Sequence, residues 1–134
     1  MIPNLQPTVC NICGASVIFV SNSKIYGREY GSGKCYLCTN PHCRAYVGTH
    51  EPRPQEALGL LATAEMRDMK KKVHELFDER WKYESNPGKR RIKRSESYKW
   101  LAKQMEIPVE ECHFGYFDME KLETAYRILK YEVL

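Results

Sequence analysis

The sequence predicts an α+β protein, with an N-terminal zinc ribbon of short antiparallel strands packed on a C-terminal part of three helices. Three observations lead to this prediction. Five of the six cysteines lie in the first third of the 134-residue chain, β-branched and aromatic runs lie between them, and beyond residue 54 apolar residues recur at steps of three and four. The first two features are typical of zinc ribbons and the third of amphipathic helices. We expect the ribbon at residues 1–53 and the helical part at residues 54–134.

The ribbon cysteines predict one structural zinc ion, because zinc takes four soft donors at tetrahedral corners and a short turn between two cysteines presents two thiolates. Cys10 and Cys13 form the first pair. Three cysteines compete for the second pair: Cys35, Cys38 and Cys43. His42, between the last two, is a further candidate. Disulfide bonds and chance clustering of buried thiols are the alternatives to zinc.

The stretch Tyr36–Cys43 reads Tyr-x-Cys-Thr-Asn-Pro-x-Cys. It resembles the second half of the small zinc ribbons at the C-terminal end of bacterial type I topoisomerases and of phage late-gene activators. This resemblance implies four zinc ligands: Cys10, Cys13, Cys38 and Cys43. Cys35 is then the alternate ligand and, if it binds no zinc, a small buried hydrophobic residue.

Short strands and turns are predicted within the ribbon. The run at residues 17–20 predicts a strand, Asn22-Ser23 a turn, and residues 25–26 the start of a return strand. Residues 36–37 and 45–47 predict a third edge around the second cysteine pair. Together these segments predict a three-stranded ribbon with zinc at one end.

The helical part shows apolar periodicity and capping signals. Thr63 is a candidate N-cap for the first helix, Pro87-Gly88 a stop, and Asp118 an N-cap for the last helix. We expect, in order, a helix at about 63–83, a basic linker at 84–94, and helices at about 95–106 and 118–132.

Composition excludes some classes of protein. The chain is 43% hydrophobic and 28% charged, which is typical of a globular protein and not of a disordered one. Its longest uncharged apolar run, residues 17–20, is too short to cross a membrane, and its first residues lack the charges of a secretory signal. We therefore expect no membrane contact and a reducing cytoplasmic location, where thiols remain available for zinc.

The net charge of +4 is unevenly distributed, with five cations within residues 89–94. Clustered cations beside a flexible break can contact phosphates, and in the ribbon tyrosines that can stack on bases alternate with cations. The candidate nucleic-acid-binding residues are Lys24, Arg28, Lys34, Arg44, Lys89, Arg90, Arg91, Lys93, Arg94, Tyr26, Tyr30 and Tyr36. A solvated basic loop and tyrosines packed over the metal site are the alternatives.

Two further motifs have plain structural alternatives. Residues 100–112 resemble a helix-turn-helix, but Glu106 stands where a turn glycine is usual, so a structural turn is the alternative. His50, His74 and His113 could form a second metal or catalytic site, or make ordinary polar contacts. The chain contains no known catalytic constellation, and we do not expect an enzyme.

Motifs along nearly the whole chain resemble a family of zinc-finger-containing domains of phages and prophages. They include Cys10-x-x-Cys13, Ala45-Tyr46-Val47-Gly48-x-His50, His74-x-x-Phe77-Asp78-x-x-Trp81 and Cys112-His113-Phe114-Gly115-x-Phe117. The resemblance implies a bound zinc ion and, if the protein is phage-encoded, the cytoplasm of a bacterial host. The predicted function is that of a small phage-type accessory protein that binds nucleic acid non-specifically, single strands included. An effector that binds a host or defence protein is the main alternative, and a metal-dependent enzyme a further one.

Overall fold

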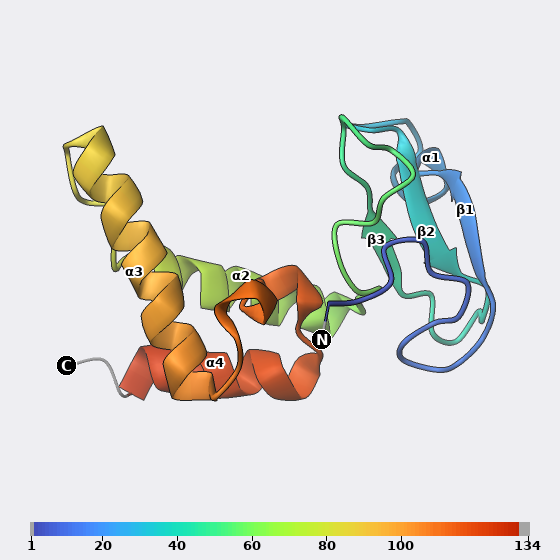
Figure 1. Ribbon diagram of the computed structural model, residues 1–134. Coiled ribbons are helices and arrows are strands. Elements are labelled where there is room, and N and C mark those ends of the chain that lie inside the picture. Colours follow the sequence, from blue (N-terminus) through green and yellow to red (C-terminus); the bar gives the residue numbers. More distant parts are fainter. Residues whose placement is uncertain (1, 132–134) are drawn as a thin grey trace. The chain divides into compact units, whose positions relative to one another are not determined.

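The structure is a computed structural model that describes residues 2–131 (Figure 1). The chain forms two compact units, one of residues Pro3–Glu65 and a second that comprises Ile2 and the residues from Met66 onward. The first contains a three-stranded antiparallel sheet and the second is helical. The predicted α+β class is confirmed. None of the helices in the described part of the chain combines the length and apolarity needed to span a bilayer.

The sheet of the first unit has the strand order β1-β2-β3. The strands are β1 (Val17–Ser21), β2 (Lys34–Cys38) and β3 (Tyr46–Gly48). Val17 pairs with Cys38, and Tyr36 pairs with Phe19 on one side and Val47 on the other. Tyr36 and Val47 share a face of the sheet because they lie directly opposite each other, and Cys38 shares it because it lies two residues after Tyr36. All three side chains point toward the core of this unit.

The connection from β1 to β2 differs from the prediction. Residues 25–26 do not begin a strand but lie in the helical turn α1 (Ser23–Tyr26), which Gly27 ends in a left-handed conformation at φ 80°. The amide side chain of Asn22 donates to the Tyr30 carbonyl at 2.8 Å and accepts from the Tyr30 N–H at 3.1 Å. These two bonds close the loop, so the return strand begins only at Lys34.

The first unit extends beyond the predicted boundary at residue 53. Ala57 forms a bridge with Thr49, and Ala62 forms one with Tyr46. Ala57 and Leu61 are fully buried and belong to the core of the sheet. Residues 54–65 are therefore part of the ribbon unit, because three short strands alone cannot cover their own apolar face.

The helical unit is built around phenylalanine side chains. Its elements are α2 (Ala64–Asp78), α3 (Pro87–Met105), η1 (Val109–Glu111), η2 (Phe114–Tyr116) and α4 (Met119–Tyr131). Phe114, from η2, contacts the rings of Phe77, Tyr98 and Phe117, with the centroid of Phe77 at 5.3 Å. Leu101 and Leu122 are fully buried. This cluster links α2, α3 and α4 into one core.

The predicted basic linker is wrong from residue 87 onward, because α3 begins there. Pro87 occupies the first helical turn, where its missing N–H costs nothing, and Asn86 caps the helix by accepting from the Lys89 N–H at 3.0 Å. The basic residues are thus helical. The preceding helix ends at Asp78, short of residue 83, because the next N–H groups turn back to nearer carbonyls, as in the Arg80 to Phe77 bond of 3.0 Å.

The helix α4 begins where the sequence predicts. Asp118 accepts from the Lys121 N–H at 2.9 Å, which is an N-cap bond. The predicted end at residue 132 lies outside the described residues. Between α3 and α4 the described chain forms only the single turns η1 and η2, so no second helix of a helix-turn-helix is present there. Glu106 instead ends α3 in a left-handed conformation at φ 57°.

Candidate metal centre

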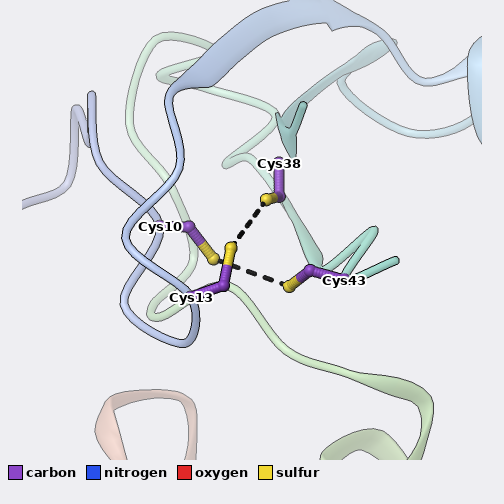
Figure 2. A group of neighbouring side chains, drawn as sticks. All are labelled: Cys10, Cys13, Cys38 and Cys43. Carbon is purple, nitrogen blue, oxygen red and sulfur yellow. Dashed lines mark hydrogen bonds between the residues drawn. The ribbon is translucent and has the colours of Figure 1, made fainter. Parts of the chain in front are cut away.

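Four sulfur atoms of the ribbon converge on one point, as Figure 2 shows. They belong to Cys10, Cys13, Cys38 and Cys43, and all lie within 4.8 Å of one another. The Sγ atoms of Cys10 and Cys43 are 3.9 Å apart, and those of Cys13 and Cys38 are 3.4 Å apart. A tetrahedral ion with bonds of about 2.3 Å to sulfur requires sulfur separations of about 3.8 Å. The arrangement therefore fits Zn²⁺.

The first two ligands come from a tight turn at residues 10–14, the first knuckle. The Cys10 N–H donates to the Ala15 carbonyl at 2.8 Å, and the Gly14 N–H returns to the Cys10 carbonyl at 3.0 Å. The Ile12 N–H points at the Cys10 sulfur at 3.4 Å. Gly14 completes the turn with φ 79°, in the left-handed region that glycine tolerates best.

The other two ligands come from residues 38–44, the second knuckle, which has the same design. The Asn40 N–H points at the Cys38 sulfur at 3.4 Å, and the Asn40 side chain accepts from the His42 N–H at 2.9 Å. Arg44 follows Cys43 with φ 52°. It therefore takes the left-handed position that Gly14 takes in the first knuckle, although arginine has no special tolerance for it.

The register of β2 decides which cysteines are ligands. Cys35 pairs with Val20 and Gly48, three residues before Cys38, so the two side chains leave opposite faces of the strand. Cys35 is only 1% exposed, and burial raises its pKa. It is a small buried hydrophobic residue and not a ligand. His42 is exposed and is not among the converging groups.

The four cysteine sulfurs need a bound cation if all of them are to be thiolates. The Ala15 N–H lowers the pKa of Cys13 to about 6, whereas burial raises the pKa of Cys38 to about 12. Four sulfurs this close cannot all be thiolates unless a positive ion offsets their charge. Zinc provides that charge. The affinity of the site for zinc decreases as the pH is lowered, because the ion must displace protons from the thiols. Four protein ligands leave no open position for water, so the ion stabilises the fold.

Residues 6–132 match the family described as a zinc-finger-containing domain. The chain belongs to this family. The resemblance found in the sequence is thereby confirmed, and the four-cysteine cluster is the site of one structural zinc in this zinc-finger-containing domain. No curated protein and no solved structure matches the chain. The predicted phage origin and cytoplasmic location stay predictions.

The candidate nucleic-acid-binding tyrosines of the ribbon differ in exposure. Tyr26 and Tyr30 are 50% and 47% exposed, and their rings meet edge to face with centroids 5.5 Å apart. The Arg28 guanidinium lies over the Tyr30 ring at 4.6 Å. Tyr36 is only 7% exposed, and its hydroxyl donates to the Gln55 carbonyl. The prediction that Tyr36 stacks on bases is therefore wrong, because its ring belongs to the core.

The remaining candidate cations lie on the surface of both units. In the ribbon, Lys24, Arg28 and Arg44 are exposed and Lys34 is half-buried. In the helical unit, the candidates lie in the first two turns of α3: Lys89, Arg90, Arg91, Lys93 and Arg94. Lys93 pairs with Glu84 at 3.2 Å, and Arg94 lies over the rings of Trp81 and Tyr98. Among the described residues, Lys89 and Arg91 have no ion-pair partner and are exposed.

The histidines make ring contacts. His74 meets Phe114 edge to face at 4.6 Å, and His113 stacks on Tyr116 at 4.4 Å. His50 belongs to the other unit. Within residues 2–131, the four cysteines are the only group of potential ligands whose donor atoms converge as a metal requires.

Sequence reasoning missed residues that shape the metal centre. Asn11 lies between the first two ligands, and its side chain both donates to the Leu61 carbonyl and accepts from the Leu61 N–H, each at 3.0 Å. It thereby ties the first knuckle to the segment that covers the sheet. No local signal in the sequence predicts that the partner of Asn11 lies fifty residues away. The equivalence of Gly14 and Arg44, by contrast, could have been predicted, because each residue directly follows the second cysteine of its pair.

Proposed function

We propose that this zinc-finger-containing domain binds nucleic acid without sequence preference, and single strands in particular. The observation on which the proposal rests is the ribbon surface formed by Tyr26, Arg28 and Tyr30. Two half-exposed rings with a guanidinium beside them offer stacking surfaces for bases and a positive charge for phosphates. Zinc holds the ribbon that presents them.

This surface is held firmly. The two bonds between Asn22 and Tyr30 and the left-handed turn at Gly27 fix the loop that bears both tyrosines. The Arg28 Nε also donates to the Tyr30 hydroxyl at 2.7 Å. Tyr26, Tyr30 and Lys34 line one open hollow of about 390 Å³. Rings fixed in advance lose little conformational entropy when bases stack on them.

The helix α3 provides a second positive surface. It has seven Lys and Arg residues and one Glu in 19 residues. Its cations do not read sequence, but each phosphate that they neutralise releases a counterion and strengthens binding at low salt. The proposal therefore predicts an affinity that falls steeply as salt is added.

Fluorescence anisotropy with a labelled single-stranded oligonucleotide tests the ribbon surface. Stacking on an aromatic side chain contributes about 1–3 kcal/mol per base, so Tyr26→Ala with Tyr30→Ala should weaken binding at least about tenfold. Tyr131→Ala is the matched control, since Tyr131 is also exposed, and it should have no effect. Equal affinities for the double variant and the wild type would contradict the proposal.

The same assay at several salt concentrations tests α3. Lys89→Ala with Arg91→Ala should make the negative slope of log affinity against log salt shallower by about 1.4, which is the effect of two lost phosphate contacts on a single strand. Lys71→Ala with Lys72→Ala removes two exposed cations from α2 and should leave the slope unchanged. An unaltered protein that retains no oligonucleotide at low salt would end the nucleic-acid proposal.

Binding to a protein partner is the second candidate. The strand β1 lies at the edge of the sheet, and its residues Ile18 and Phe19 are exposed. An open edge with apolar side chains can accept a strand of another chain. In this case Ile18→Lys would abolish binding of the partner, whereas neither nuclease treatment nor the substitutions in α3 would affect it.

A further inference from the structure

Arg80, in the turn after α2, has no counter-ion in the part of the chain that the structure describes. Its guanidinium lies over the Trp100 ring at 4.0 Å. Among residues 2–131 no carboxylate lies within 4.0 Å of it, and its Nε is covered and has no acceptor. Burial lowers the pKa of Arg80, which reflects the cost of a charge removed from water. A half-buried cation of this kind is stabilised by a nearby anion, and residues 2–131 do not supply one within ion-pair distance.

An open hollow of about 320 Å³ lies beside this guanidinium. Its lining residues are Arg80, Lys93, Glu96, Ser97 and Trp100. Of its two cations, Lys93 is paired with Glu84, so Arg80 supplies the positive charge that an anion would neutralise. Its walls are fixed, because the Lys93 ammonium is held by Glu84 at 3.2 Å and the Ser97 hydroxyl donates to the Lys93 carbonyl at 2.7 Å.

We propose that this hollow binds a phosphate group, held by the Arg80 guanidinium and the Lys93 ammonium beside the Trp100 ring. A planar guanidinium matches the oxygens of a phosphate with two parallel hydrogen bonds, and stacking on an indole holds it in place without using its terminal N–H groups. Glu96 opposes the phosphate and limits its affinity. The phosphate belongs either to a polynucleotide backbone, in which case this inference rests on the proposed function, or to a small phosphorylated ligand.

Tryptophan fluorescence reports on the hollow directly, because the chain has two tryptophans and Trp100 lies beneath Arg80. Inorganic phosphate, pyrophosphate and a single-stranded oligonucleotide are titrated separately at constant ionic strength, with chloride as the control anion. We expect a saturable change in emission with at least one of the three, and none with chloride.

Variants of opposite expected sign make the test specific. Arg80→Gln should weaken the saturable binding at least tenfold, and Arg80→Lys should weaken it less, since it keeps the charge but loses the planar donor pair. Glu96→Gln should strengthen it about threefold, because a repelling charge is removed. Lys71→Gln, an exposed cation on α2, is the matched control and should change nothing. Should Arg80→Gln fail to fold, as judged by circular dichroism, an unchanged affinity in Glu96→Gln overturns the proposal.

The outcomes separate this inference from the proposed function. Oligonucleotide binding by anisotropy that leaves tryptophan emission unchanged and is unaffected by Arg80→Gln refutes the phosphate site and leaves the proposed function standing. Saturable binding of pyrophosphate without any oligonucleotide binding supports the site, identifies a small ligand, and refutes the proposed function. The absence of a saturable change with all three ligands refutes the site.

Discussion

The residue after the second cysteine of each knuckle provides a test of how the metal centre is built. Gly14 and Arg44 both adopt left-handed backbone conformations, with φ 79° and 52°. A Cβ atom at Gly14 would meet no heavy atom within 4 Å, so the effect of Gly14→Ala is that of the backbone alone. Arg44→Gly should have the opposite effect, and Arg44→Ala is its control because alanine removes the charge but keeps the strain.

The expected sizes follow from two opposing terms. The left-handed conformation costs a residue with a Cβ about 1–2 kcal/mol. An alanine in place of glycine offsets about 0.4–1 kcal/mol of this cost, because the unfolded chain with alanine has fewer conformations to lose on folding. We therefore expect Gly14→Ala to destabilise the ribbon by about 1 kcal/mol, and Arg44→Gly to stabilise it by about the same amount relative to Arg44→Ala.

Zinc affinity measures this difference, because metal binding and folding of a small zinc unit are coupled. In competition with a chromogenic chelator, a change of about 1 kcal/mol is about a fivefold change in the dissociation constant. Gly14→Ala should bind zinc about fivefold more weakly than the wild type, and Arg44→Gly about fivefold more tightly than Arg44→Ala. Wild-type affinity in Gly14→Ala, or equal affinities in the two Arg44 variants, would refute the reasoning.

Three further predictions concern the two units. Removing zinc with a chelator should unfold the ribbon and leave most of the helical circular dichroism, because structural zinc contributes about 10–16 kcal/mol to such small units; simultaneous loss of both signals would contradict this. Phe114→Ala should cost the helical unit about 3–5 kcal/mol in urea unfolding without lowering zinc content, since Phe114 is the centre of the aromatic core. Partial desolvation of the His74 ring beside Phe114 lowers the pKa of His74 from 6.5, so the folded unit binds fewer protons than the unfolded chain and loses stability as the pH falls below 6.5. His74→Gln should flatten this dependence in urea unfolding at several pH values, and an unchanged slope would show that His74 is not its source.

The metal centre could largely be predicted from the sequence, because ligand type and spacing are local properties. The spacing identified Cys10 and Cys13 directly, but the choice among the other cysteines depended on the strand register. Cys35 and Cys38 lie three residues apart in β2, and only the alternation of a strand places them on opposite faces. Once β2 is located at residues 34–38, the ligand set follows.

Other parts of the fold depend on contacts between distant residues. Leu61 fills the core of the ribbon and binds Asn11, but the segment around it has no periodicity that predicts burial. Pro87 is compatible with two predictions, because a proline can stop a preceding helix or occupy the first turn of a new one. Its position after the cap residue Asn86 favours the start of a helix, which the structure shows. Tyr36 is likewise predicted incorrectly from local pattern alone. The alternation of tyrosines and cations predicts an exposed ring, whereas the position of Tyr36 in the central strand buries it.

Zinc content of three purified proteins tests the metal centre most directly: the wild type, Cys35→Ser and Cys43→Ser, each measured by native mass spectrometry and elemental analysis. One zinc ion per chain is expected in the wild type and in Cys35→Ser, with a markedly lower content in Cys43→Ser after brief dialysis against a chelator. A wild-type protein without zinc, or a Cys35→Ser variant that loses zinc while Cys43→Ser keeps it, would contradict the four-cysteine site.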